Sequence, residues 1–522
     1  MTDASVATAK PPRWGFLRGI WVVALIALLY VRLGGVDEGG RTAFTIISVL
    51  SGLFLSTLWL LFLSRLPWSS RFKGLALAIA LFIAVRATVR IKEFEGDIFP
   101  VLTWRWEPPK DTTLTALPEA PKTSTPVADA PKLVSYEPGP NGFAQWLGNR
   151  RDGKMEAGIV FKAEQWPPKE NWRIPIGAGW SGLVVLGNKA ITQEQRGPDE
   201  LVSCYELATG KPLWSHKDGV RFSETMGGDG PRATPVIYQG LVYALGATGI
   251  LNCLELETGA LKWTRDTLKD AKQENLMWGK SASPLIVDDL VIISLGKSMD
   301  KTLAAFNRMS GEPAWRSGDD ESSYASPALG TLCGQKMIVS VNKDSVSGHD
   351  PKTGEMLWRN TFPGAPAKCA DPVILDGDRV FIGVGYGVGC KMLKIEKASD
   401  GKFGAKELWK NIRFKPKFSN ILIKDGFSYG LDEGVLVCLN LESGERLWKD
   451  GSYGHGQILL AGDTILVQAE SGAVALVEAS SKGFKELFKF PAMKAKTWNS
   501  PTIAGKTLLV RNAEEAVSYT LP

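Results

Sequence analysis

The sequence predicts an all-β fold, an eight-bladed β-propeller of four-stranded blades, preceded by three transmembrane α-helices. Two observations predict the propeller: a Trp recurs shortly after Thr-Gly or a related pair every 39 to 52 residues, and alternating apolar runs bounded by turn residues precede each such Trp. A third observation, three long apolar segments near the N-terminus, predicts the helices.

The apolar segments are Gly19–Gly35, Thr42–Leu63 and Gly74–Ile91. A membrane-spanning helix needs about 20 mainly apolar residues, and the second segment meets that length most clearly. A cleaved signal peptide is the alternative for the first segment alone, but it lacks a small-residue cleavage site and two further apolar segments follow it. We therefore interpret residues 1–92 as a membrane anchor.

The basic residues flanking these segments favour one orientation. Short cytoplasmic flanks carry an excess of Lys and Arg. Six basic residues lie on one predicted side, and five on the other: Lys10, Arg13, Arg18, Arg65, Arg71 and Lys73, against Arg32, Arg41, Arg86, Arg90 and Lys92. This small difference predicts a cytoplasmic N-terminus and an extracytoplasmic propeller, on the periplasmic side of an inner membrane.

Residues 93–141 are interpreted as a Pro-rich extracytoplasmic linker. Trp104 and Trp106 are at the start of this region, where interfacial aromatic residues are expected, although a packed segment would also account for them. From Glu107 to Asn141 the chain is rich in Pro, Ala, Thr and Lys, so it cannot bury enough apolar surface to offset its ordering entropy. The sequence predicts a semi-extended spacer there.

The repeated Trp residues are predicted to hold neighbouring blades together. The glycine of each turn allows a positive φ, and the indole that ends the outer strand is large enough to wedge between blades. The seventh repeat has Phe488 at the equivalent place. The predicted blade-docking residues are Trp214, Trp263, Trp315, Trp358, Trp409 and Trp448.

Eight inner strands are predicted from Trp180 onward, but the last blade lacks an outer strand of its own before Pro522. The segment Asn171–Gly177 resembles the sequence after the turn in other repeats. We expect it to complete the eighth blade, which would close the ring and remove free sheet edges. The propeller is predicted to span residues 142–522.

The repeats, together with FAQWLGNRRDGKM at residues 143–155, resemble the pyrroloquinoline-quinone (PQQ) repeat of the PQQ-like β-propeller family. Within it they resemble a membrane-anchored group of PQQ-binding-like propellers, related to the outer-membrane-protein assembly propeller. The resemblance implies the fold and two kinds of function, a non-catalytic propeller or a quinoprotein dehydrogenase. The dehydrogenases hold PQQ with Ca²⁺ on acidic and amide oxygens, and the alcohol-oxidising branch adds a disulfide between adjacent cysteines. This chain has no adjacent cysteines, and its Ca²⁺ ligands cannot be matched residue by residue.

Cysteine and histidine spacing predicts no metal site. Cys204, Cys253 and Cys438 occupy the same place in three repeats, too far apart on neighbouring blades for a disulfide, so we expect buried free thiols. None of the three histidines is paired at ligand spacing with His or Cys. His349 is expected in a surface turn, whereas His455 begins an inner strand and could face the axis. The glycine-rich run 383–389 is expected to lie within a strand, which argues against dinucleotide binding.

Candidate ligand-binding residues lie where the inner strands begin and in the turns after the second strands, around the predicted axial funnel. Arg and Lys there suit a carboxylate or phosphate. The alternative is that each residue only satisfies backbone groups or pairs with a neighbour. The candidates are Trp180, Gln195, Arg196, Arg232, Tyr324, Lys417, His455, Glu470, Trp498, Arg511 and Asn512.

These observations favour a membrane-anchored binding or assembly scaffold with protein partners, without catalysis, metal or cofactor. The alternative is a PQQ-dependent dehydrogenase that oxidises an alcohol or sugar and carries PQQ with calcium. Nucleic acid is not an expected partner, because the net charge of +6 is dispersed along the chain. A nucleotide or hydrolase function lacks support, since no Walker loop or nucleophile elbow is present.

Overall fold

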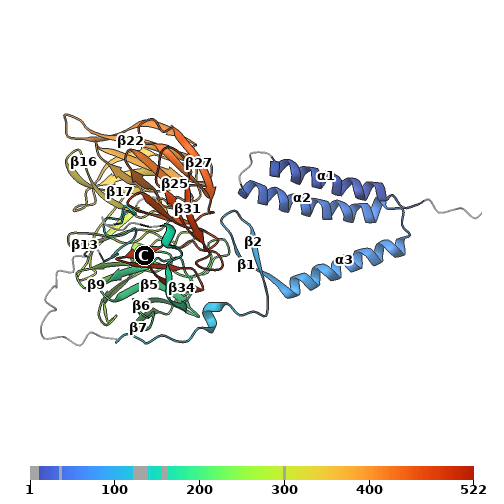
Figure 1. Ribbon diagram of the computed structural model, residues 1–522, viewed down its shortest axis with the longest axis horizontal. Coiled ribbons are helices and arrows are strands. Elements are labelled where there is room, and N and C mark those ends of the chain that lie inside the picture. Colours follow the sequence, from blue (N-terminus) through green and yellow to red (C-terminus); the bar gives the residue numbers. More distant parts are fainter. Residues whose placement is uncertain are drawn as a thin grey trace, which may run out of the picture. The chain divides into compact units, whose positions relative to one another are not determined.

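The chain folds as an N-terminal helical unit and a β-propeller unit (Figure 1). The computed structural model describes residues 11–33, 38–121, 139, 141–155, 161, 163–297 and 301–522. The first unit comprises residues 1–108 with 225–228, and the second comprises residues 109–224 with 229–522.

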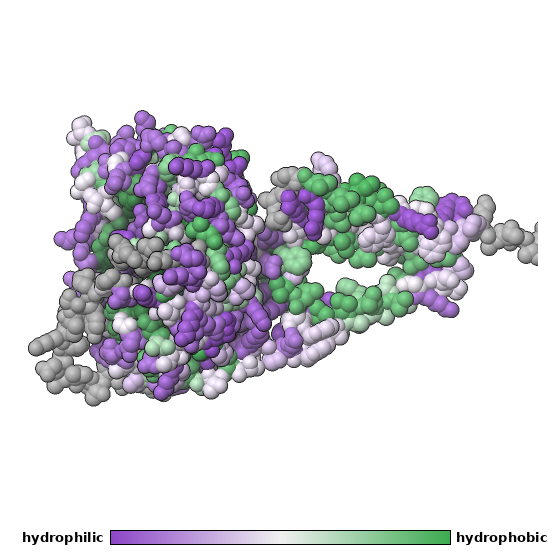
Figure 2. Space-filling model, viewed as in Figure 1, coloured by the Kyte–Doolittle hydropathy of each residue, from purple (hydrophilic) through white to green (hydrophobic). Residues whose placement is uncertain are grey.

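The helical unit contains α1 (Trp14–Leu33), α2 (Glu38–Leu58) with a π-helical turn η1 (Trp59–Leu63), and α3 (Trp68–Thr88). All three predicted apolar segments are therefore helical, and their length and composition are sufficient to cross a membrane. Large apolar side chains are exposed along them, as the green surface in Figure 2 shows. The third helix ends earlier than predicted, because Val89 begins strand β1 (Val89–Phe94).

Helices α1 and α2 pack closely through a glycine. A Cβ atom on Gly52 would lie 3.1 Å from the Trp21 ring, so the missing side chain allows this approach. The Trp14 and Trp59 rings are 5.3 Å apart, and the Trp59 Nε1 donates to the Arg13 carbonyl. The two helices thus form one antiparallel pair.

The propeller consists of eight four-stranded antiparallel sheets, which confirms the predicted fold class. Blade 1 is β4 (Val184–Leu186), β5 (Lys189–Arg196), β6 (Asp199–Glu206) and β7 (Pro212–Asp218); blade 2 is β8 (Val236–Tyr238), β9 (Leu241–Leu245), β10 (Ile250–Glu255) and β11 (Leu261–Asp266). Blade 3 is β12 (Leu285–Val287), β13 (Leu290–Ser294), β14 (Leu303–Asn307) and β15 (Pro313–Ser317); blade 4 is β16 (Ala328–Leu332), β17 (Gln335–Val341), β18 (Ser345–His349) and β19 (Met356–Thr361).

The remaining blades follow the same order. Blade 5 is β20 (Val373–Leu375), β21 (Arg379–Val384), β22 (Gly389–Lys397) and β23 (Phe403–Asn411); blade 6 is β24 (Leu422–Lys424), β25 (Phe427–Asp432), β26 (Val435–Asn440) and β27 (Arg446–Ser452). Blade 7 is β28 (Gln457–Ala461), β29 (Thr464–Gln468), β30 (Val474–Glu478) and β31 (Glu486–Phe490); blade 8 is β32 (Thr502–Ala504), β33 (Thr507–Arg511), β34 (Glu515–Thr520) and β3 (Lys169–Pro175). Short helices are η2 (Lys110–Thr113), η3 (Ala163–Gln165) and α4 (Thr267–Ala271).

Blade 8 is completed by β3, as predicted from Asn171–Gly177. Strand β3 pairs antiparallel with β34, and the Trp172 Nε1 donates to the Leu207 carbonyl of blade 1. Trp172 therefore occupies the same place as the repeated Trp residues of the other blades. N-terminal and C-terminal segments share one sheet, which joins the two ends of the propeller.

The repeated Trp residues contact the following blade through a carbonyl and a glycine. The Trp214 Nε1 donates to the Leu256 carbonyl, and a Cβ on Gly259 would lie 2.4 Å from the Trp214 ring. Trp263, Trp315, Trp409 and Trp448 likewise donate to carbonyls of the next blade. Five of the six Trp residues lie near the start of the outer strand, not at its end as predicted, because the strand continues along the blade edge beyond them; Trp409 lies near the end of β23.

Trp358 is the exception among these residues. It pairs across the sheet with Gly348, where a Cβ would lie 2.1 Å from its Nε1 atom. Without a side chain at Gly348 the indole lies over its own sheet, and its Nε1 lies 3.3 Å from the Met337 Sδ of the same blade. In blades 1, 2 and 6 a cysteine occupies the position of Gly348, so Cys204, Cys253 and Cys438 face the indoles as small apolar residues. All six cysteines are free thiols.

Two local predictions were wrong. His349 is fully buried in β18 and not in a surface turn, because the strand extends to this residue and its ring packs against Ser317 of blade 3. Its ring nitrogens lie 3.1 Å from the Ser317 hydroxyl and 2.8 Å from the Ser347 hydroxyl. The glycine run 383–389 does not stay within one strand: it forms the turn between β21 and β22, with Tyr386 at φ +58°.

The region expected to be a linker is partly structured where it is described. Residues 89–104 form the hairpin of β1 and β2 (Pro100–Trp104). Residues 109–121 lie along blade 1: the Ser215 and Ala120 backbone amides donate to the Pro118 and Ser215 carbonyls, both at 2.7 Å. Asp111 pairs with Arg221 at 2.6 Å. This segment covers the exposed edge of β7, whereas residues 122–138 and 140 lie outside the described part.

Candidate functional site

Strand direction defines two ends of the propeller. In an antiparallel blade each strand reverses direction, so the starts of the inner strands and the turns between second and third strands lie at the same end. We call this the entry end. The Thr-Gly turns lie at the opposite end. All eleven candidate residues from the sequence belong to elements of the entry end.

Residues 141–155, which we call the axial segment, run through the centre of the ring. The Phe143 and Val185 backbones exchange two hydrogen bonds of 2.8 Å, and the Met155 amide donates to the Leu460 carbonyl. The segment contacts the inner strand of every blade or the residues beside it. One such contact per blade, in order, is at Val185, Ile237, Pro284, Pro327, Asp371, Leu422, Leu460 and Gly505.

Two half-buried side chains of opposite charge, Arg151 and Asp371, hold the axial segment toward the entry end. The Trp146 Nε1 donates to Asp371 at 2.8 Å, and the Ser326 amide donates to the same carboxylate at 2.6 Å. Burial raises the pKa of Asp371 to about 6, while the Arg151 charge opposes this shift. Burial lowers the pKa of Arg151 to about 10, and its guanidinium donates to the Pro284 carbonyl. The axial segment is thus held at two points, by the hydrogen bond from Trp146 to Asp371 and by the hydrogen bond from Arg151 to the Pro284 carbonyl.

Five of the candidate residues come together at the entry end, across blades 6, 7, 8 and 1. The Trp180 and Trp498 rings are 5.1 Å apart. Glu470 accepts from the Trp498 Nε1 at 2.7 Å and from the His455 amide at 3.0 Å. Lys417 is the fifth, with its ammonium 5.3 Å from the centre of the Phe418 ring.

Aromatic rings and lysines extend this group. Phe418 lies 4.9 Å from Trp498 and 5.4 Å from His455. The Lys496 ammonium lies 4.2 Å from the Trp498 ring and 4.8 Å from Trp180, a cation–π arrangement. We call these eight residues the axial cluster: Trp180, Tyr386, Lys417, Phe418, His455, Glu470, Lys496 and Trp498. Lys496, Trp180 and His455 are buried, whereas the other five are half-buried and so remain partly accessible.

The remaining entry-end aromatic residues continue toward blades 2 to 4. Tyr324 lies 5.6 Å from Trp278, and its hydroxyl accepts from the Trp278 amide. Burial raises the pKa of Tyr324 above its usual range. The Arg232 guanidinium lies 4.4 Å from the Phe222 ring. Burial lowers the pKa of Arg232 to about 10, opposed first by Glu200.

The other four candidates have structural partners. Arg511 is 1% exposed and donates to the Gly177 and Gln193 carbonyls. Asn512 caps the turn before β34 by accepting from the Glu515 amide, and Gln195 accepts from the Phe222 amide. Arg196 pairs with Glu194 at 3.0 Å and donates to the Thr115 carbonyl of the segment along blade 1. For these residues the alternative stated from the sequence, satisfaction of local groups, describes the geometry.

Sequence reasoning missed several residues of this end. Phe418 adjoins Lys417, and Lys496 lies two residues before Trp498, so proximity to chosen residues could have indicated both. Tyr386 was overlooked because its glycine-rich run indicated only packing. No sequence pattern indicated Lys280 and Lys368, whose ammonium groups donate to the Leu295 and Phe362 carbonyls. Burial lowers the pKa of Lys280 to about 7 and that of Lys368 to about 8.

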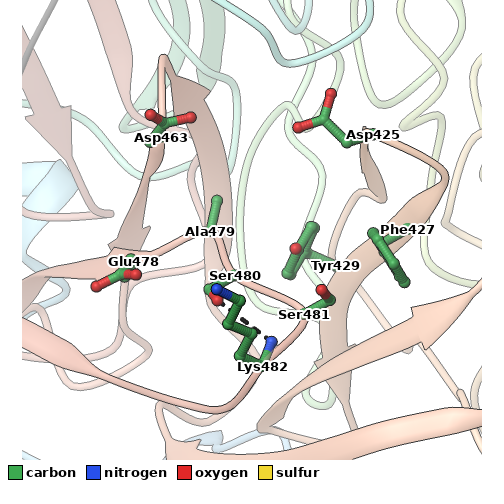
Figure 3. Close-up of a pocket in the computed structure, with 9 residues that line it drawn as sticks. All are labelled: Asp425, Phe427, Tyr429, Asp463, Glu478, Ala479, Ser480, Ser481 and Lys482. Carbon is green, nitrogen blue, oxygen red and sulfur yellow. Dashed lines mark hydrogen bonds between the residues drawn. The ribbon is translucent and has the colours of Figure 1, made fainter.

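A pocket of about 420 Å³ lies away from this cluster, between blades 6 and 7 at the Thr-Gly end (Figure 3). Asp425, Asp463 and Glu478 lie around it, with Lys482 on the loop after β30. The Lys424 ammonium pairs with Asp425 and Asp463 at 2.5 and 3.0 Å. The Lys485 ammonium pairs with Glu478 at 3.0 Å, so each carboxylate around the pocket contacts a lysine.

The entry end does not fit the quinone and calcium pair of the dehydrogenases. Ca²⁺ needs six to eight oxygen ligands, several of them carboxylates. In the described part of the chain no three His, Cys, Asp or Glu side chains are placed to hold a metal. Glu470 is held by Trp498 and His455, and Asp371 by Trp146 and Ser326. That the protein works without a cofactor stays a prediction.

The fold and the sequence repeats are similar to those of PQQ-like propellers. The family model described as outer membrane protein assembly factor BamB matches residues 198–450, which confirms the resemblance stated from the repeats. BamB of Bordetella pertussis is 23% identical over 295 residues, covering 53% of this chain and 67% of that protein. BamB of Burkholderia pseudomallei is 24% identical over 333 residues, covering 61% of this chain and 78% of that protein.

Solved structures agree on the fold. The quinohemoprotein alcohol dehydrogenase of Comamonas testosteroni superposes with a TM-score of 0.53 at 11% identity, over 73% of this chain and 80% of that one. At this identity the likeness concerns the propeller architecture alone.

Proposed function

We propose that this chain is a membrane-anchored, extracytoplasmic propeller that acts as a binding and assembly scaffold for other proteins and performs no catalysis. Three lines support the proposal. The helices are long and apolar enough to span a membrane, the repeats match the model of an assembly factor, and the entry end presents aromatic and charged side chains.

The axial cluster is the observation that carries the proposal. Half-buried aromatic rings and the ammonium group of Lys417 offer an apolar contact beside a positive charge. Such a surface suits a peptide segment that presents an apolar side chain next to a carboxylate, because buried aromatic residues are frequent anchors in protein interfaces. The axial segment lies behind this surface and contacts every blade, which gives the cluster a fixed support.

A charge reversal tests this role. Lys417→Glu should reduce the recovery of protein partners from crosslinked native membranes, because it places a negative charge where the proposed carboxylate binds. Lys482→Glu is the matched control, since Lys482 is exposed at the opposite end of the propeller. Both variants should show the same thermal unfolding midpoint as the unaltered chain.

Two results would contradict the proposal. One is equal recovery of all partners by Lys417→Glu and by the control. The other is rapid reduction of an artificial electron acceptor with an alcohol or sugar after addition of PQQ and Ca²⁺, which would favour the dehydrogenase.

A further inference from the structure

The hairpin that follows the third helix has one entirely apolar face. Strands β1 and β2 pair Val89 with Trp104, and Ile91 with Leu102. Because neighbouring residues of a strand point to opposite faces, these four side chains share one face. A register shift between Ile91 and Glu93 then brings Phe94 opposite Pro100.

This bulge keeps the two faces chemically distinct. An extra residue reverses the alternation of β1, so that Phe94 joins the apolar face although an unbroken strand would turn it away. The apolar face contains Val89, Ile91, Phe94, Pro100, Leu102 and Trp104. The opposite face contains Arg90, Glu93, Val101 and Thr103.

Large apolar side chains of this hairpin are exposed. Leu102 is 61% exposed, and Trp106 is 65% exposed and stacks on Trp104 at 4.9 Å. Phe99 at the turn is also exposed. A two-stranded hairpin is marginally stable in water unless its apolar face is covered. We therefore expect the apolar face of this hairpin to be covered by another apolar surface.

The position of the hairpin directly after α3 indicates what covers this face. Val89 follows the last residue of α3 without a linker, and the Arg105 guanidinium donates to the Arg86 and Val89 carbonyls, joining the hairpin to the helix end. A helix of 21 residues is about 32 Å long, close to the thickness of the hydrocarbon core. If α3 spans the bilayer, the hairpin begins at the level of the lipid headgroups.

The side-chain chemistry suits that level. Trp residues concentrate at membrane–water interfaces, where the ring is apolar and the N–H reaches water. Arg86, Arg90, Lys92 and Arg105 lie in or beside the hairpin, where their side chains can reach headgroup phosphates, and the acidic residues Glu93, Glu95, Asp97 and Glu107 balance their charge. We infer that β1 and β2 form an interfacial hairpin whose apolar face lies in the outer part of the bilayer beside the end of α3. This inference rests on α3 being a membrane span and is independent of what the propeller binds.

Spin labels at neighbouring positions test the inference. Leu102→Cys and Thr103→Cys place a label on the apolar and polar faces of the same strand, in full-length protein reconstituted into vesicles containing phosphatidylglycerol. Oxygen concentrates in the bilayer, whereas a water-soluble nickel complex is excluded from it. Cys333→Ser and Cys369→Ser remove the two thiols that are not fully buried, and this parent without an introduced cysteine gives the background signal.

At Leu102→Cys the label should collide more often with oxygen than with the nickel complex. At Thr103→Cys the label should collide more often with the nickel complex than with oxygen. High nickel accessibility at both positions would mean that the face lies in water, and would overturn the inference. Exclusion of both reagents at Leu102→Cys would mean that protein covers the face, and would overturn it equally. Either result leaves the test of the axial cluster unaffected.

Discussion

At the scale of single residues, burial decides roles that sequence position suggested wrongly. His349 precedes Asp350 and the glycine of a turn, a context typical of an exposed side chain. In the fold its ring lies between Ser317, Ser347 and the Gly354 carbonyl, and burial lowers its pKa to about 4. The neutral imidazole is therefore part of the blade 4 core.

His349 should make propeller stability depend on pH. Below pH 6.5 the unfolded chain binds a proton at this residue and the folded chain does not, so the free energy of unfolding falls as pH decreases from 6.5 toward 4. A shift of this size corresponds to about 3 kcal/mol. His349→Gln should remove this part of the dependence, measured as the change in urea midpoint between pH 7.5 and pH 4.5. Equal dependence in both proteins would contradict the assignment.

The repeated Trp positions predicted the order of the strands but not every contact that the Trp side chains make. Their recurrence after Thr-Gly predicted the strand order of each blade. It could not show that Trp358 contacts Met337 within its own blade, because that depends on Gly348 in the neighbouring strand. Nor could the recurrence show that Trp172, which is far in the sequence from the other three strands of blade 8, contacts blade 1.

At the scale of elements, the axial segment is the structural link between the blades. Its sequence was noticed for its resemblance, yet no periodicity indicated that fifteen residues would contact all eight inner strands or their flanks. Hydrogen bonds to Val185, Ile237 and Leu460 satisfy backbone groups that face the axis. The segment thereby ties blades that are far apart in the sequence.

The Arg151 and Asp371 pair should be energetically coupled. Asp371→Asn removes the carboxylate charge that favours the Arg151 guanidinium and should lower the free energy of unfolding. Arg151→Met with Asp371→Asn removes both charges and should recover much of this loss. Chemical unfolding of the two single variants and the double variant gives the coupling free energy. Additive losses would show that the two side chains act independently.

At the scale of the whole molecule, three helices, a hairpin and one ring share the chain. Three membrane spans would place the two ends of the helical unit on opposite sides of a membrane. The excess of basic residues on one side of the apolar segments favours a cytoplasmic N-terminus.

A membrane-impermeant maleimide should label Lys482→Cys in intact spheroplasts, because the propeller is proposed to be extracytoplasmic. Ser5→Cys should react only after lysis. The comparison uses the Cys333→Ser, Cys369→Ser parent, so that only the introduced thiol is accessible. Labelling of Ser5→Cys before lysis, with protection of Lys482→Cys, would reverse the proposed topology.

The candidate site was predicted only in part. Trp180, Lys417, His455, Glu470 and Trp498 come together, because equivalent points of successive inner strands must surround one axis. The other four candidates also lie in elements of the entry end, but their side chains bond to backbone carbonyls and amides or form an ion pair: Gln195, Arg196, Arg511 and Asn512. Arg511 donates to the Gln193 carbonyl of blade 1, which its own repeat does not show. Arg196 and Asn512 instead bond to nearby groups, the Glu194 carboxylate and the Glu515 amide, and sequence spacing does not show which nearby group a side chain reaches.

The sequence by itself determined the three apolar helices, the eight blades and the closure by β3, since each follows from hydrophobic periodicity or repetition along the chain. The tertiary structure alone decided that residues 109–121 cover the edge of β7 and that residues 141–155 occupy the axis. The physical reason is the range of the interactions. Periodicity records what a residue does within its own strand or helix, whereas these arrangements satisfy hydrogen bonds and charges contributed by segments up to several hundred residues away.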